Sequence, residues 1–201
     1  MTDDRRVADY LRKLEELHRQ ITFGISPLHD PVIKARWLFD RLWKDKPARY
    51  RPKGPYRLSD AIDAQMGKEG RVVGNCLGLT LLYNCLLKKM EISAGALYLE
   101  NAFGVGPHVL TLLKVNEGTV DIENILPEGF DYKGHLNDAS RMIWKEKDLV
   151  ADIYCSMGNE LFEAGRPARA LACYERAIAL NPKYEKAVLN KAIVLQQIQG
   201  G

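Results

Sequence analysis

The stretch from Gly74 to Asn124 constrains the fold of this chain more than any other. It begins with Gly-Asn-Cys and continues as an apolar run that predicts a helix over residues 77–90. A strand is predicted over Ala94–Glu100, and a second strand opens on Gly-Pro-His at 106–108. The following strand ends in Val-Asp-Ile-Glu-Asn at 120–124. Any chemistry that the chain performs is expected in this stretch.

Cys76 is the candidate nucleophile. A thiol attacks a carbonyl only as a thiolate, and an ordinary cysteine titrates near ~8.5, so a catalytic cysteine needs a local cause that stabilises its anion. Asn75 is a predicted N-cap, which places Cys76 in the first helical turn, where unpaired backbone amides and the helix dipole favour an anion. His108 is predicted to be the second group that favours the Cys76 thiolate, because an imidazolium stabilises the anion and later supplies the leaving-group proton.

Asp121 and Glu123 compete for the role of the acid that orients His108. Alternation along a strand places both carboxylates on one face. We favour Glu123 slightly and keep Asp121. Asn124 is the third choice, since it faces away unless a bulge intervenes.

The preference for Glu123 depends on the predicted hairpin register. If the turn at 116–118 closes the hairpin near its middle residue, Asp121 pairs around Leu113 and Glu123 around Thr111. At ~3.3 Å per residue, Glu123 is then nearer the histidine, although neither acid lies directly across from it.

The order Cys, His, acid resembles the transglutaminase-like superfamily, and more narrowly the short bacterial transglutaminase-like domains that carry a tetratricopeptide tail. The matching motifs are Gly-Asn-Cys-Leu-Gly-Leu at 74–79, Gly-Pro-His-Val at 106–109 and Val-Asp-Ile-Glu-Asn at 120–124. The resemblance covers roughly residues 20–140. Many members have Asp-Pro at the acid, whereas this chain has Asp-Ile-Glu-Asn, so the identity of the acid stays open.

The resemblance implies an α+β fold with a papain-like core, in which the helix that carries Cys76 packs on an antiparallel sheet. It also implies a cysteine acyl-enzyme mechanism acting on an amide or peptide substrate, with His108 and an acid completing a triad. Water would make the chain a peptidase, amidase or deamidase, and an amine would make it a transferase. The alternative is a catalytically silent scaffold whose helical tail recruits a protein partner.

Stabilisation of an oxyanion has weaker candidates. Gln65 invites comparison with the glutamine that papain-like enzymes place ahead of the nucleophile, but its spacing from Cys76 is loose. The backbone N–H of Cys76 is the better donor. The Asn75 side chain is the alternative if it does not cap the helix.

The remaining cysteines and histidines predict no further site. Cys85 lies on the opposite side of the predicted helix from Cys76 and should belong to the core. The sequence contains no CxxC pair, so no metal site and no cofactor are predicted. The remaining residues of these two types are isolated in sequence: Cys155, Cys173, His18, His29 and His135.

Composition and charge narrow the class of protein. The chain has 201 residues, 46% of them apolar, and a net charge of +3. It shows neither a signal-peptide pattern nor a membrane-spanning run, so we expect a soluble, cytoplasmic protein. The segment from Pro47 to Arg57 interleaves basic and aromatic residues, but a solvated linker is preferred over nucleic-acid binding. A wall of the substrate cleft is the third interpretation of this segment.

Helical patterns flank the central stretch. An amphipathic helix is predicted over Val7–Ile21. A second opens at the N-cap and N1 pair Asp30-Pro31 and is stopped by Pro47, and a short one capped by Ser59 runs through Met66. A linking helix is predicted over Asn137–Trp144. We expect a transglutaminase-like domain over residues 1–146 and a helical tail over residues 147–201.

The tail fits one tetratricopeptide repeat from Ala151, with a partial or capping helix over Lys183–Ile198. Large, small and helix-breaking residues fall at the consensus positions: Tyr154, Met157, Gly158, Leu161, Ala170, Tyr174, Ala177 and Pro182. Asn159 and Asn190 match two positions of a clamp for a peptide carboxylate, but the basic residues of that clamp would come from a third repeat. The predicted partners are a protein or peptide substrate and a protein bound by the tail.

Overall fold

The structure is a computed structural model. It describes residues 3–26, 30–68, 72–116 and 118–200.

The chain divides into two compact units, Met1–Ile143 and Trp144–Gly201. The sequence predicted the boundary after residue 146. Each unit has its own packed helices.

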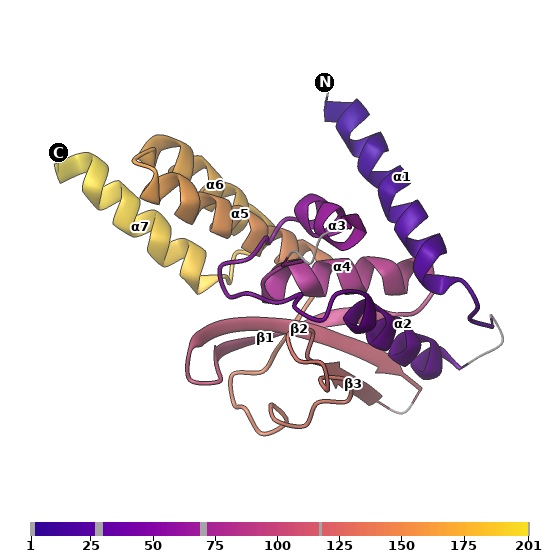
Figure 1. Cartoon of the computed structure of the whole chain (residues 1–201). Helices are drawn as coiled ribbons and strands as arrows, with labels where there is room; N and C mark the ends of the chain where they lie inside the picture. The colour runs from indigo at the N-terminus through magenta and orange to yellow at the C-terminus, as the bar shows by residue number, and fades with distance from the viewer. Residues whose placement is uncertain (1–2, 27–29, 69–71, 117, 201) are drawn as a thin grey trace. The chain divides into compact units, whose positions relative to one another are not determined.

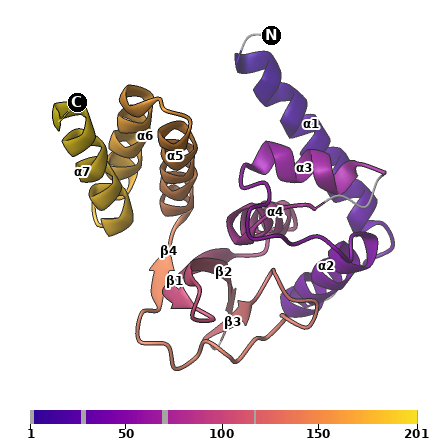
Figure 2. The same cartoon turned by 60° about the vertical axis from the view of Figure 1, so that its left-hand side comes forward.

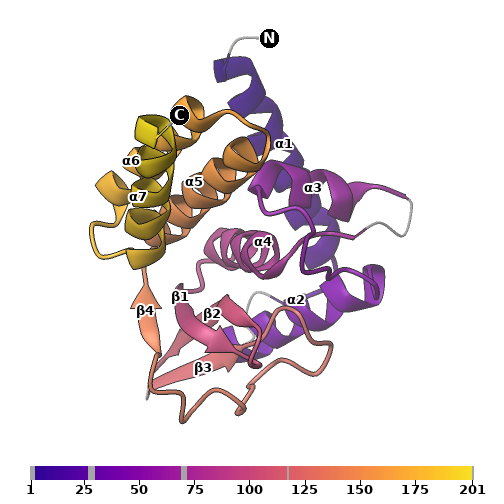
Figure 3. The same ribbon diagram turned by 90° about the vertical axis from the view of Figure 1, so that its left-hand side faces the viewer.

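The first unit combines helices with an antiparallel sheet (Figure 1). The four-stranded sheet has the order β3-β2-β1-β4. Helix α4 lies between this sheet and α3 (Figure 3). The elements are α1 (Asp3–Thr22), α2 (Pro31–Asp45), α3 (Leu58–Met66), α4 (Cys76–Lys89), β1 (Ala94–Ala102), β2 (Gly106–Val115), β3 (Gly118–Ile122) and β4 (Met142–Trp144).

Helix α4 is the centre of the first unit because it is apolar on nearly every side. Leu79, Leu82 and Leu86 are each fully buried within the main core. Cys85 is half-buried and packs against the same core. A helix that is apolar all round must be covered on all sides, and here the sheet and the helices α1 and α3 cover it.

The hairpin between β2 and β3 differs from the predicted register by one residue. Val115 pairs with Gly118, so the connection is a two-residue loop, the commonest hairpin length. Gly118 has φ 138°, which a glycine adopts without strain. Asp121 therefore pairs with Leu112 instead of Leu113. The predicted turn centre, Glu117, lies outside the described residues.

Two predicted helix features are wrong. Residues 137–144 form turns and then β4, because Asp138 accepts hydrogen bonds from the backbone and hydroxyl of Ser140 at 2.8 and 2.7 Å, a local pattern that competes with helix formation. Ser59 lies inside α3, whose N-cap is Arg57, and so does not cap that helix.

The second unit is helical. It comprises α5 (Glu146–Glu163), α6 (Pro167–Leu180) and α7 (Glu185–Gly200), which lie side by side (Figure 2). Gly158 allows α5 and α6 to approach closely, because a side chain there would overlap the Tyr174 ring. Among the described residues, no helix combines the length and apolarity needed to cross a bilayer.

Candidate active site

Cys76 is the first residue of α4 and is half-buried. As predicted, Asn75 caps this helix, its side chain accepting a hydrogen bond from the Gly78 amide at 3.1 Å. The backbone N–H of Asn75 in turn donates to the Pro55 carbonyl at 2.9 Å. The cap and this backbone contact fix the position of the thiol in the first helical turn.

The segment from Pro47 to Arg57 is packed against the start of α4, so its interpretation as a solvated linker is wrong. The amides of Val73 and Gly74 both donate to the Arg49 carbonyl, at 2.8 and 3.1 Å. A side chain at Gly78 would overlap the Pro55 carbonyl oxygen, so only glycine permits this close approach.

The guanidinium of Arg49 is not available to bind a phosphate group of a nucleic acid. Its side chain is buried and its guanidinium lies 5.6 Å from the centre of the Trp43 ring. Burial lowers the pKa of Arg49 to about 9. Nucleic-acid binding by this segment would depend on its exposed basic side chains, and Arg49 is not one of them.

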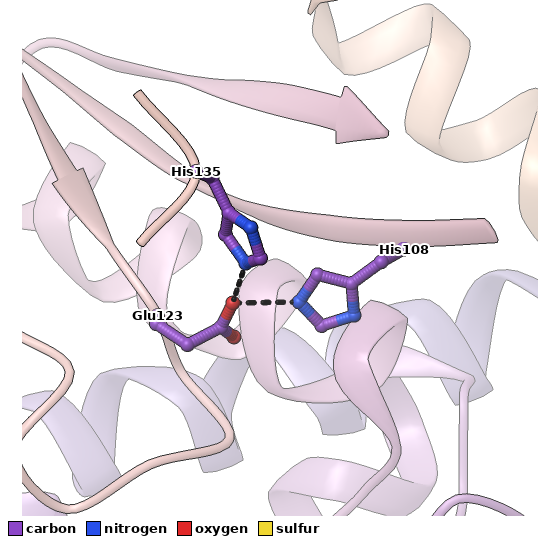
Figure 4. A group of neighbouring side chains, drawn as sticks. All are labelled: His108, Glu123 and His135. Carbon is purple, nitrogen blue, oxygen red and sulfur yellow. Dashed lines mark hydrogen bonds and ion pairs between the residues drawn. The ribbon is translucent and has the colours of Figure 1, made fainter. Parts of the chain in front are cut away.

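His108 lies near the start of β2, opposite Leu99, and is buried. Its Nε2 atom is 2.8 Å from Oε2 of Glu123. Figure 4 shows the second ring nitrogen directed away from this carboxylate. Cys76 and His108 line the same cleft, and the thiol is one of the groups that raise the pKa of the imidazole. The imidazole thus contacts the carboxylate and shares a cleft with the thiol.

Glu123 directly follows β3 and is fully buried. Its amide donates to the Gly129 carbonyl at 2.8 Å, so the chain folds back on itself just after the carboxylate. The neighbouring Asn124 donates to the hydroxyls of Thr80 and Thr111 at 3.2 and 2.9 Å, which ties this loop to α4 and β2. Asn124 therefore supports the loop and does not contact His108 in the hydrogen bonds described.

His135 is isolated in sequence but lies beside Glu123 in the structure, so it is a member of the site that the sequence did not reveal. Its Nε2 lies 3.3 Å from the same Oε2 of Glu123 (Figure 4). The rings of Phe103 and Tyr132 pack on it, with centroid distances of 4.8 and 5.0 Å. No periodicity governs the irregular loop that carries it, so no sequence signal links this histidine to the strand end.

The electrostatics of the site favour a charged imidazole beside a charged carboxylate. Burial alone would lower the pKa of His108, but hydrogen bonds to Cys76 and Glu123 outweigh burial and raise it to about 10. Burial likewise opposes the charge on Glu123, but hydrogen bonds from His108 and His135 lower the pKa of this carboxyl below its ordinary value.

Asp121, the competing acid, has a different partner. Its two carboxylate oxygens accept hydrogen bonds from Arg141 at 2.6 and 3.1 Å. This contact raises the pKa of the guanidinium. Arg141 also donates to the His135 carbonyl at 3.0 Å, so the Asp121 pair holds the loop that carries His135.

The predicted oxyanion candidates occupy other positions. The Asn75 oxygen is engaged in capping α4. Gln65 is buried in α3 and is not among the residues that line the cleft around Cys76 in the described part of the chain. The backbone N–H of Cys76 is a first-turn amide without an intrahelical acceptor, which makes it the best placed donor.

The carboxylate and its two histidines also form a set of metal-ligand types. One ligand atom each from His108, Glu123 and His135 lie within 4.8 Å of one another. Zn²⁺ accepts such ligands at ~2.0–2.2 Å. The distances of 2.8 and 3.3 Å separate ligand atoms from one another, and they suit hydrogen bonds as well as ligands that share one ion. The absence of a metal and a cofactor stays a prediction.

A cleft of about 410 Å³ opens beside the thiol and the imidazole. Its walls come from the segment before α4, the tip of the β1–β2 hairpin and the loop after Glu123. The lining residues are Tyr50, Pro52, Cys76, Ala102, Phe103, Val105, Gly106, Pro107, His108, Ile125 and Leu126.

The helical unit has a hollow of its own, of about 330 Å³. Asn159 and Asn190, the two clamp-like asparagines, lie in its lining and are joined by a hydrogen bond of 2.8 Å. Tyr174 donates to the same Asn159 oxygen at 2.8 Å. Lys186 adds a cationic side chain to the lining.

Comparison with known proteins identifies the tail. Residues 151–184 match the tetratricopeptide repeat family. No curated protein and no solved structure matches the chain. The chain therefore combines an α-helical region that contains a tetratricopeptide repeat with a mixed unit of helices and antiparallel sheet.

Proposed function

We propose that the first unit is a cysteine-dependent acyl-transfer enzyme that acts on an amide or peptide. The observation that carries this proposal is a buried pair of His108 and Glu123, with 2.8 Å between the imidazole and the carboxylate, in which His108 lines the same cleft as Cys76. A nucleophile, a base and an orienting acid in this order are what acyl transfer requires.

The proposed chemistry proceeds in two steps. The Cys76 thiolate attacks the carbonyl carbon of the amide, and the charge moves to the carbonyl oxygen, which the Cys76 backbone N–H stabilises. The C–N bond then breaks as His108 gives its proton to the leaving amine, which leaves a thioester on Cys76. Water or a second amine attacks this thioester, His108 takes the proton of that nucleophile, and the acyl group leaves the thiol.

The resemblance to transglutaminase-like proteins supports the same proposal. A cysteine at the start of a helix that packs on an antiparallel sheet, with a histidine and an acid supplied by the strands, is the arrangement of the papain-like core in that superfamily. In this chain we assign the role of the acid to Glu123, which contacts His108, because Asp121 accepts hydrogen bonds from Arg141.

A peptide mixture tests the proposal directly. A casein digest is incubated with the chain, with or without a biotin-labelled alkyl amine, and mass spectrometry follows cleavage, deamidation and amine incorporation. We expect at least one of these products with the native chain and none with Cys76→Ser, which keeps the size of the side chain. Products of equal amount from both proteins would contradict the proposal.

Protein binding by the helical unit is the second candidate function, and the match of residues 151–184 to a tetratricopeptide repeat favours it. Such repeats bind proteins through the hollow face of stacked helices, and the hollow that Asn159, Lys186 and Asn190 line is suited to an extended peptide. The two functions are compatible, because the tail can deliver a substrate to the first unit.

The two functions separate in a pull-down experiment. Partners captured from a lysate by the native chain are compared with those captured by Cys76→Ser and by Lys186→Glu. Binding by the tail predicts that Cys76→Ser retains the partners and that Lys186→Glu loses those with acidic segments. Retention of every partner by Lys186→Glu would show that the hollow does not bind these partners.

A further inference from the structure

The cleft beside Cys76 and His108 is free of ionised carboxylates and ammonium or guanidinium groups in its described lining. Apart from the thiol, the imidazole and the Tyr50 hydroxyl, its side chains are apolar. Because the imidazole of His108 is already paired with Glu123, a charged substrate group that enters the cleft loses water without gaining a free ion-pair partner, whereas an apolar side chain gains by leaving water. The lining thus favours apolar side chains of a substrate over charged ones.

The hairpin tip gives this cleft two unusual apolar residues. Val105 is 88% exposed and Phe103 is 49% exposed, although both lie at the cleft. Exposed apolar side chains that border a reactive centre have water to lose when a ligand binds. The lining also includes Ile125 and Leu126 from the loop after Glu123.

The backbone of the tip holds Phe103 in a conformation that bulky residues rarely adopt. Its φ is 55°, and the adjacent Gly104 has φ 68°. In this position the Phe103 ring packs edge-on against His108, with centroids 5.6 Å apart, and against His135 at 4.8 Å. A strained residue packed on the reactive imidazole indicates a functional position more often than a structural accident.

We infer that the substrate of this cleft carries an uncharged apolar side chain on the residue whose carbonyl is attacked, and that the apolar side chains of Phe103, Val105, Ile125 and Leu126 receive it. This inference rests on the proposed function, because it concerns the substrate of the same thiol. It adds a class of substrate, namely peptides with leucine-like or phenylalanine-like residues at the acyl position.

The test compares alkylating probes that differ only in one side chain. Acetyl-leucyl and acetyl-aspartyl chloromethyl ketones each place their side chain beside the reacting carbon, and the thiolate of Cys76 displaces chloride to form a thioether. Each rate is divided by the rate of the same probe with glutathione, and iodoacetamide measures the intrinsic reactivity of the thiol. Peptide mass spectrometry assigns the alkylation to Cys76.

We expect the leucyl probe to react about tenfold or more faster than the aspartyl probe after this correction. Val105→Lys should reverse much of this preference, because it replaces an apolar wall with a cation. Phe23→Lys is the matched control, since Phe23 is 86% exposed, close to the 88% of Val105, and is not part of the cleft lining. This control should keep the native preference.

Three different results would count against the inference. If iodoacetamide labels Cys76 but the corrected leucyl and aspartyl rates are equal, the apolar specificity is wrong and the acyl-transfer proposal stands. If Cys76 reacts with neither iodoacetamide nor the ketones in the folded chain, both proposals fail. A preference that Val105→Lys leaves unchanged would remove the hairpin tip from the substrate site.

Discussion

The Glu123 amide donates to the Gly129 carbonyl at 2.8 Å, and this close return leaves no space for a side chain at Gly129, where a Cβ would overlap the Glu123 carbonyl oxygen. A glycine outside the proposed triad thus determines where the carboxylate lies.

Gly129→Ala should therefore lower the free energy of unfolding by about 1–3 kcal/mol, because the backbone next to Glu123 has to move. Urea unfolding measures the change. Gly67→Ala is the control. A Cβ at residue 67 would lie 3.3 Å from its nearest non-neighbouring atom, the Asp63 carbonyl oxygen, and the residue has φ −62°. An equal effect of both substitutions would show that the Glu123 loop is not specially constrained.

The ion pair of His108 and Glu123 predicts a pH-dependent stability. The folded chain raises the pKa of His108 to about 10, so its contribution is fully present below the ordinary value of ~6.5 and is lost as pH rises toward 10. The folded chain lowers the pKa of Glu123, so that contribution is present above ~4.3 and is lost as pH falls through the lowered pKa.

Glu123→Gln keeps the size of the side chain but removes its charge. We expect it to destabilise the chain by about 1.5–3 kcal/mol near pH 6, with a smaller difference from the native chain as pH approaches 10. Urea unfolding at a series of pH values measures this difference. A difference that grows between pH 6.5 and 10 would contradict the charged pair.

Asp121 and Glu123 should respond differently to loss of charge. Asp121→Asn weakens the pair with Arg141 and should lower stability by about 1–3 kcal/mol without slowing the iodoacetamide labelling of Cys76. Glu123→Gln should slow that labelling. If Asp121→Asn slows it as much as Glu123→Gln does, the assignment of the acid to Glu123 is wrong.

His135 is expected to act as a positioning residue, because it contacts Glu123 and not the thiol in the contacts described. His135→Ala should slow labelling of Cys76 less than His108→Ala does, and His135→Gln should recover most of the loss, since glutamine can still donate to the carboxylate. A chelator should change none of these rates. Slower labelling after removal of a bound metal would favour the cation site that His108, Glu123 and His135 could form.

Much of the fold could be predicted from the sequence because its signals are local. The cap at Asn75 and the apolar run behind it mark α4, and the repeat consensus marks the tail. The hairpin register was missed by one residue because loop length depends on the turn conformation at Gly118, which the sequence pattern did not fix.

The site was predictable only where regular elements supply it. Cys76 opens a helix and His108 lies on a strand, so periodicity and order indicated both. His135 reaches Glu123 through an irregular loop held by Arg141, and no local pattern encodes that return. The proline, glycine and basic residues of the segment before α4 also suit a solvated loop, so its sequence did not indicate that it packs against the start of this helix.

The rate of iodoacetamide labelling at each cysteine as a function of pH tests the central claim most directly. Burial raises the pKa of Cys155 to about 11 and also raises that of Cys173, so these thiols and the half-buried Cys85 are slow internal references. We predict that Cys76 alone labels rapidly near pH ~6 and that His108→Ala slows it by about tenfold or more. Labelling of Cys76 no faster than that of the reference thiols in the folded chain would contradict an activated nucleophile.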